Sequence, residues 1–168
     1  PIRGRSAGMQ GAVKGVAVNP MNQAEASKVV LATYGEFLHD PAGYRPEEAW
    51  ERAISEVAGE NARAFTLVAN TSLYSCLGGP EAPRLEELTQ AALQAFELDD
   101  HQAAEIDELY GYLTELDEAC YELRYEPANL RLRDELLPWL EQLEQWTWLG
   151  RWSIEALRSV AEEPYAGA

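Results

Sequence analysis

The chain has 168 residues, of which 46% are hydrophobic and 25% are charged, a composition typical of a folded domain and not of a disordered tail. Its formal net charge is −16, from 29 acidic and 13 basic residues, and such a field repels nucleic-acid phosphates and anionic membrane surfaces. We therefore expect neither nucleic acid nor a membrane as a partner, and the sequence contains no apolar run of about 18 residues that would predict a membrane span.

One segment near the start of the chain is typical of a β-strand. Residues 13–18 read VKGVAV and stop at Asn19-Pro20, after a Gly- and Arg-rich stretch that predicts a loop. A buried parallel strand needs neighbours for its backbone hydrogen bonds, and the sequence supplies no second strand. We therefore expect residues 13–18 to be the last strand of a larger α/β body. Because an unpaired apolar edge invites association, we predict that residues 13–18 pair with a second copy as a homodimer, or rearrange.

Amphipathic helices are predicted for the rest of the chain. Asn22, with Glu25 three residues later, resembles a capping box and predicts a helix from 22 to 38. Pro46 and the two glutamates after it predict the start of a second helix, which ends at Gly59. Apolar residues at helical spacing predict further helices over residues 61–76, 84–97, 100–124, 128–147 and 149–162. Short joints between long helices predict antiparallel packing in a bundle.

The histidines and cysteines give no sign of a metal or cofactor site. His39 and His101 each lack a second His or Cys at ligand spacing, so we expect no metal and no cofactor. Cys76 and Cys120 fall in apolar helical stretches and are expected to be buried thiols, with no disulfide required.

Four tryptophans lie close together near the end of the sequence. Trp139 fits the apolar stripe of its predicted helix and is expected in the core. Trp146, Trp148 and Trp152 cannot all face one direction, so we expect one of them to be exposed. An exposed Trp can stack on a sugar or a peptide, whereas the simpler interpretation is packing between the last two helices.

Asn19 is the candidate binding residue. In a strand-helix unit of a parallel sheet, the residue at the carboxyl end of the strand points into the mouth of the active site. The amide of Asn19 can both donate and accept a hydrogen bond, which suits recognition of a hydroxyl. Asn-Pro is also a common start of a turn, and position alone does not decide between the two roles.

Two stretches of the sequence carry a resemblance to a known family. VKGVAVNPMNQAEAS, at residues 13–27, and the following ATYGEFLHDPAGYRPEEAWERAI resemble the family 84 glycoside hydrolases, which are β-N-acetylglucosaminidases, also labelled hyaluronidases or protein O-GlcNAc hydrolases. The later LRDELLPWLEQLEQW is similar to the helical region after the catalytic barrel of that family. The resemblance implies a mainly α fold in which residues 1–42 are the remnant of a (β/α)8 barrel, with strand 13–18 and helix 22–38. Residues 43–168 would then be the post-catalytic helical bundle.

The resemblance also implies a function. By motif match, Asn19 would hydrogen-bond a sugar hydroxyl. The family hydrolyses terminal N-acetylglucosamine by substrate-assisted retaining catalysis, with two adjacent aspartates on an earlier strand. Asp99-Asp100 lies instead at a predicted joint between helices, so we expect no catalytic residue in this chain and no activity without the N-terminal barrel portion. Within the intact enzyme the partner would be an N-acetylglucosamine-bearing glycan or glycoprotein. The alternative function is a non-catalytic helical module that binds another protein.

Overall fold

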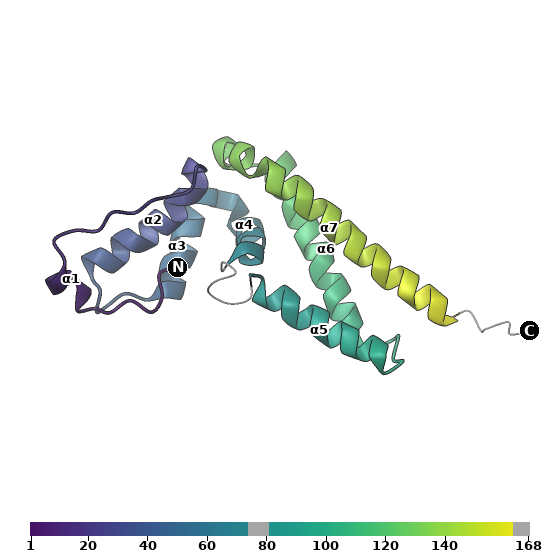
Figure 1. Cartoon of the computed structure of the whole chain (residues 1–168). Helices are drawn as coiled ribbons and strands as arrows, with labels where there is room; N and C mark the ends of the chain where they lie inside the picture. Colours follow the sequence, from purple (N-terminus) through teal and green to yellow (C-terminus); the bar gives the residue numbers. More distant parts are fainter. Residues whose placement is uncertain (74–80, 163–168) are drawn as a thin grey trace, which may run out of the picture.

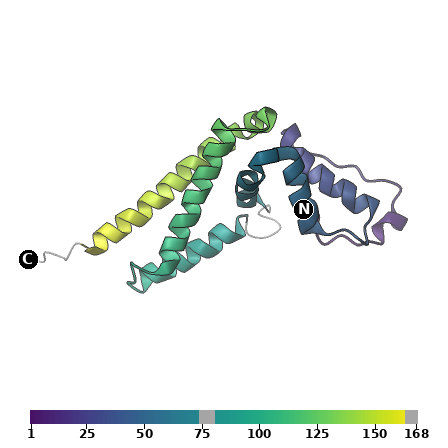
Figure 2. The same cartoon turned by 180° about the vertical axis from the view of Figure 1, so that it is seen from behind.

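A computed structural model describes residues 1–73 and 81–162, and this part of the chain is helical and holds no β-strand (Figures 1 and 2). The helices are α1 (Met9–Ala12), α2 (Ala24–His39), α3 (Pro46–Ala58), α4 (Ala62–Ala69), α5 (Pro83–Glu97), α6 (Ala104–Tyr125) and α7 (Leu130–Glu162), with 3-10 turns η1 (Gly59–Asn61) and η2 (Asn70–Ser72). The prediction of a mainly helical bundle is confirmed. None of the described helices is long and apolar enough to cross a membrane.

Helices α6 and α7 form a long antiparallel hairpin that organises the molecule (Figure 1). Three ion pairs between the two helices show that they run in opposite directions. From the joint outward they are Arg124 with Glu141 at 2.8 Å, Asp117 with Arg151 at 2.6 Å, and Asp107 with Arg158 at 2.7 Å. A joint of four residues, 126–129, allows this arrangement because short connections place consecutive helices side by side.

Two apolar clusters lie along this hairpin. The first is built at the joint end, where α2, α3 and α4 pack on α6 and α7, and its fully buried members include Val29, Ile54, Cys120, Leu132 and Leu140. The second lies at the far end, where α5 packs against the start of α6, and includes Leu88, Ile106, Leu113 and Ile154. Of the apolar stripe predicted for α6, Ile106, Leu109, Leu113, Leu116, Cys120 and Leu123 are buried, whereas Tyr110 is only partly buried.

Residues 13–18 do not form the predicted strand. They run as an irregular, exposed segment between α1 and α2, with Val13 44% exposed and Val16 39% exposed. The described residues offer no strand beside them, and a lone strand leaves its peptide groups to water and gains no packing. Pairing of this segment with a second copy stays a prediction.

Several predicted helix bounds also need correction. The helix expected over 22–38 is α2, and that expected over 100–124 begins at Ala104. The helix expected over 61–76 is shorter, because α4 ends at Ala69 and a 3-10 turn follows; Cys76 lies outside the described residues. The two helices expected over 128–147 and 149–162 are the single helix α7, which continues through Pro138 and Gly150.

The tryptophans of α7 are more exposed than the sequence predicts. Trp139 is 52% exposed and is therefore not a core residue. Trp146, Trp148 and Trp152 are 60%, 59% and 59% exposed, so all three face solvent rather than one. The side of α7 that faces α6 is occupied by smaller residues such as Leu140 and Thr147, and this leaves the tryptophans on the uncovered sides.

Candidate functional site

Asn19 lies in the irregular segment that leads into α2. Its side chain is exposed, and no described residue makes a hydrogen bond with it. Five residues later α2 begins, and the Ser27 hydroxyl in its first turn donates to the Met21 carbonyl at 3.3 Å. The side-chain amide of Asn19 is therefore exposed, and it lies two residues before Met21, whose carbonyl is bonded to α2.

The first turn of α2 is held by a side chain from α7. The carboxylate of Glu135 accepts hydrogen bonds from the backbone N–H of Glu25, at 2.8 and 3.0 Å, and of Ala26, at 3.2 Å. Free N–H groups at a helix start favour a negatively charged acceptor. Asn22 does not act as the predicted cap, because α2 makes no hydrogen bond with a capping side chain of its own segment. The bundle thus fixes the helix that follows Asn19.

A partly buried group of hydrogen bonds around Asn129 also connects α2 to α7. The Asn129 amide donates to the Val57 carbonyl at 2.9 Å and to Glu25 at 3.3 Å, while its oxygen accepts from the backbone of Leu132 at the start of α7. Glu25 is buried, and the hydrogen bonds from Lys28 and then Asn129 hold its pKa below the usual value. The carboxylate is therefore charged at neutral pH and ties α2 to the start of α7.

Asn61 makes the matching link on the other side of this joint. Its amide donates to Glu122 at 2.8 Å and to the Glu126 carbonyl at 3.2 Å, and its oxygen accepts from the Ala128 N–H at 2.6 Å. Because Asn61 is buried, these partners satisfy its polar atoms away from water. The two asparagines hold α2, α3 and η1 in one arrangement on the hairpin.

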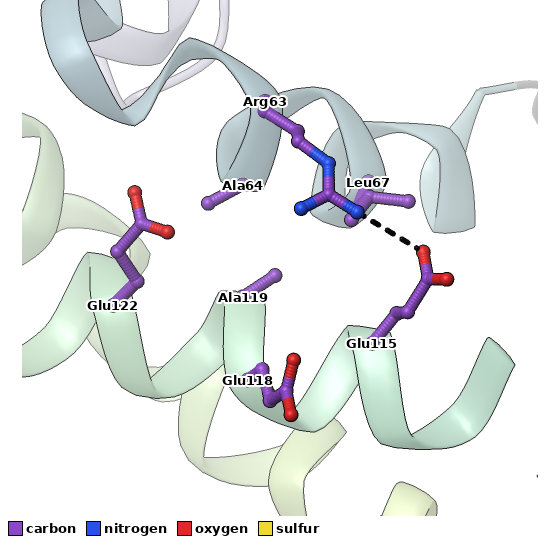
Figure 3. A pocket seen from close by; sticks show the side chains of 7 residues that line it. All are labelled: Arg63, Ala64, Leu67, Glu115, Glu118, Ala119 and Glu122. Carbon is purple, nitrogen blue, oxygen red and sulfur yellow. Dashed lines mark hydrogen bonds and ion pairs between the residues drawn. The ribbon is translucent and has the colours of Figure 1, made fainter. Parts of the chain in front are cut away.

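A cavity of about 60 Å³ lies between α4 and α6 (Figure 3). Glu115 and Glu122 reach toward α4 from either side of Ala119, and Arg63 donates to Glu115 at 3.5 Å. Pockets for small molecules span roughly 300–1,000 Å³, so this cavity admits water and not a sugar. Two of its acidic groups are already engaged, since Glu122 accepts from Asn61 and Glu115 accepts from Arg63.

A wider hollow of about 430 Å³ lies between the end of α3 and the start of α7. Most of its lining residues are exposed, including Glu56, Leu130 and Arg131, so it is a shallow depression of the surface. The side-chain amide of Asn129, which lines this hollow, already donates to the Val57 carbonyl and is not available to a ligand. Neither hollow is lined by Asn19.

The described residues do not gather into a metal or acid-base centre. His39 is exposed at the end of α2, and His101 contacts Asp99 at 2.7 Å in the joint between α5 and α6. No group of three or more His, Cys, Asp or Glu side chains suited to a metal occurs in 1–73 or 81–162. Burial raises the pKa of the Cys120 thiol to about 12, and nearby Glu144 and Asp117 act in the same direction. Cys120 is therefore a structural thiol and not a nucleophile.

Two comparisons relate the chain to known proteins. Residues 1–70 match the family model described as beta-N-acetylglucosaminidase. The chain is similar to the solved structure of CpGH84B, with a TM-score of 0.80 and 26% sequence identity. This similarity covers 92% of the chain and 27% of the CpGH84B chain, so the chain spans about a quarter of that relative's length. The likeness therefore includes the segment of Asn19 and also the bundle that holds it.

Proposed function

The chain belongs to the family 84 glycoside hydrolases, of which it represents a C-terminal part, and from this premise we propose that it completes the sugar site of a β-N-acetylglucosaminidase. In that enzyme residues 13–18 are the last barrel strand, Asn19 binds a hydroxyl of the sugar, and the helical bundle supports the barrel from outside.

The observation that carries this proposal is the contrast between Asn19 and the helix after it. The segment before Asn19 is apolar and exposed in this chain, as expected for residues that normally contact neighbouring strands. The start of α2 is instead firmly held by Glu135 and the Ser27 hydroxyl. Active sites of (β/α)8 barrels lie at the carboxyl ends of the strands. If residues 13–18 join the barrel as its last strand, the held helix after them keeps Asn19 at that end.

The chemistry is assigned to residues outside this chain. In the substrate-assisted route the acetamido oxygen of the sugar attacks the anomeric carbon, and the bond to the leaving oxygen breaks as an aspartic acid protonates it. A second aspartate polarises the acetamido group. Water, which gives a proton to the first aspartate, then attacks the same carbon and displaces the acetamido oxygen, so that configuration is retained. Asn19 takes no part in these transfers. Its amide orients the sugar by one donated and one accepted hydrogen bond.

The test is the Asn19→Ala substitution in the intact enzyme, assayed on an aryl N-acetylglucosaminide. Removing one partner of a buried hydrogen bond to the sugar should raise the barrier by about 1–3 kcal/mol, which lowers kcat/KM by about 5- to 150-fold. Asn22→Ala is the matched control, because Asn22 is an exposed asparagine three residues later in the same segment. It should leave kcat/KM within about twofold of the unaltered enzyme.

Two results would count against this function. Equal kcat/KM for the Asn19 and Asn22 variants would remove Asn19 from the sugar site. Hydrolysis by the 168-residue chain alone would show that this chain carries its own catalytic residues, which would contradict the proposal that they lie in the barrel portion. The family match favours this function over an independent protein-binding module.

A further inference from the structure

The start of α7 binds the start of α2 at two places (Figures 1 and 2). The Glu135 carboxylate accepts from the backbone N–H groups of Glu25, at 2.8 Å, and Ala26, at 3.2 Å. Just before α7, the Asn129 amide donates to the Glu25 carboxylate at 3.3 Å. The same turn of α2 is therefore bound through its backbone and through a side chain.

Glu135 is carried by a part of α7 that is fixed on the rest of the bundle. Leu132 and Leu140, which precede and follow it, are 2% and 0% exposed in the first apolar cluster. Arg124 of α6 pairs with Glu141 in the next turns of α7 at 2.8 Å. The charge at position 135 therefore has a defined place, and a helix N-terminus is attracted to such a charge. Position 135 thus sets where α2 begins.

The connection from α2 back to Asn19 is short and stiff. The hydroxyl of Ser27, a buried residue, donates to the Met21 carbonyl at 3.3 Å. Between Met21 and Asn19 lies Pro20, whose ring fixes its own φ angle and restricts the residue before it to extended conformations. Few free torsions separate the bonded carbonyl of Met21 from the side chain of Asn19. A shift of α2 therefore moves Asn19 with it.

We propose that Glu135 is a positioning residue of the sugar site, which from its place in the bundle sets where Asn19 meets the sugar hydroxyl. This inference rests on the function proposed above for Asn19. Glu135 bonds to α2, so it acts on the sugar through Asn19 and not by contact. A hydrogen bond depends on distance and angle, and a small displacement of Asn19 therefore weakens its bond to the sugar.

This role differs from the stability that a helix cap provides. A cap that only stabilises the fold changes the amount of folded enzyme, and its effect is the same whichever residue stands at position 19. A residue that acts through Asn19 loses its effect on the sugar once the Asn19 amide has been removed. Combined substitutions therefore separate the two roles.

The test is a double-mutant cycle in the intact enzyme, with kcat/KM measured on an aryl N-acetylglucosaminide. Glu135→Gln keeps the size of the side chain but removes its charge and one acceptor oxygen, and it should lower kcat/KM by about 3- to 30-fold. In the Asn19→Ala background the same substitution should change kcat/KM by less than about twofold.

Asp134→Ala is the matched control for this cycle. Asp134 directly precedes Glu135, but it is exposed and, among the described residues, pairs with Arg133 and not with α2. It should leave kcat/KM within about twofold in both backgrounds.

A second measurement does not depend on how much of a variant is folded. Free N-acetylglucosamine should inhibit the enzyme competitively, and an inhibition constant does not change with the concentration of active enzyme. Ser27→Ala removes the hydroxyl that holds Met21 and leaves the cap from Glu135 in place. Both Ser27→Ala and Glu135→Gln should raise this inhibition constant by about 3- to 30-fold, and neither should do so in the Asn19→Ala background.

The outcomes distinguish this inference from the function on which it rests. A loss of kcat/KM in Asn19→Ala but not in Glu135→Gln would overturn the positioning role and leave Asn19 in the sugar site. Equal losses from Glu135→Gln in the two backgrounds, or an unchanged inhibition constant, would overturn it as well. An unaltered kcat/KM in Asn19→Ala would contradict the proposed function and the positioning role together.

Discussion

At the scale of single residues, the start of α2 depends on a partner 110 positions away in the sequence. The Glu135 carboxylate accepts from the N–H groups of Glu25 and Ala26, which no residue of their own segment satisfies. A local cap such as the predicted Asn22 would fix the helix alone. A cap supplied by α7 also fixes where α2 lies on the bundle, and with it the segment that carries Asn19.

Removing this distant cap should destabilise the chain. We expect Glu135→Ala to lower the free energy of unfolding by about 1–2 kcal/mol, because three donated hydrogen bonds to a charged acceptor are lost. Urea denaturation followed by circular dichroism measures the change. Asp134→Ala is the control, since Asp134 is exposed and, among the described residues, pairs with its neighbour Arg133, and it should cost well under 1 kcal/mol. Equal losses for the two variants would rule out the capping role.

At the scale of elements, α7 shows what a glycine can mean in a helical sequence. Gly150 predicts a joint between two helices, yet α7 passes through it without interruption. A Cβ atom at this position would lie 2.8 Å from the Leu113 Cδ1 atom of α6. Gly150 therefore permits close approach of the two helices instead of ending one of them.

This interpretation predicts different effects on stability when two glycines of the same hairpin, Gly111 and Gly150, are replaced by alanine. Gly111 in α6 is exposed, and a Cβ there would meet no atom within 4 Å, so Gly111→Ala should stabilise the chain by about 0.5–1 kcal/mol. Gly150→Ala gains the same helix propensity but must displace Leu113, so we expect it to be at least about 1 kcal/mol less stable than Gly111→Ala. Thermal unfolding of the two variants compares them directly, and an equal gain for both would show that α6 and α7 do not need Gly150.

The elements that sequence could predict are those with one apolar stripe. α6 has such a stripe, and its buried residues and its end follow from the period, although it begins at Ala104 and not at residue 100. α7 carries apolar residues on two sides, with Leu140 buried toward α6 and Trp139 on an exposed side, and periodicity does not say which side another helix covers. Asn19 is a candidate because it follows a strand-like run, and its role stays a prediction. Glu135 could not, because its role depends on a contact between segments far apart in sequence.

At the scale of the whole molecule, segment 13–18 is where we expect this chain to differ from the proposed intact enzyme. Among the described residues no backbone acceptor lies opposite the N–H groups of residues 14–18, and Val13 alone donates, to Met9 at 3.1 Å. In the 168-residue chain these amides should exchange hydrogen as fast as those of an unstructured peptide, whereas a barrel strand in the intact enzyme should slow them by at least about 100-fold.

Hydrogen exchange followed by mass spectrometry tests both states of this segment on one scale. Peptides from α6 provide the internal reference, because that helix is buried on the hairpin and should be protected in both proteins. Slow exchange of residues 14–18 that grows with protein concentration would indicate pairing with a second copy through this segment. Fast exchange in the intact enzyme would contradict the barrel strand, and the free amide of Asn19 would then have no sugar site to enter.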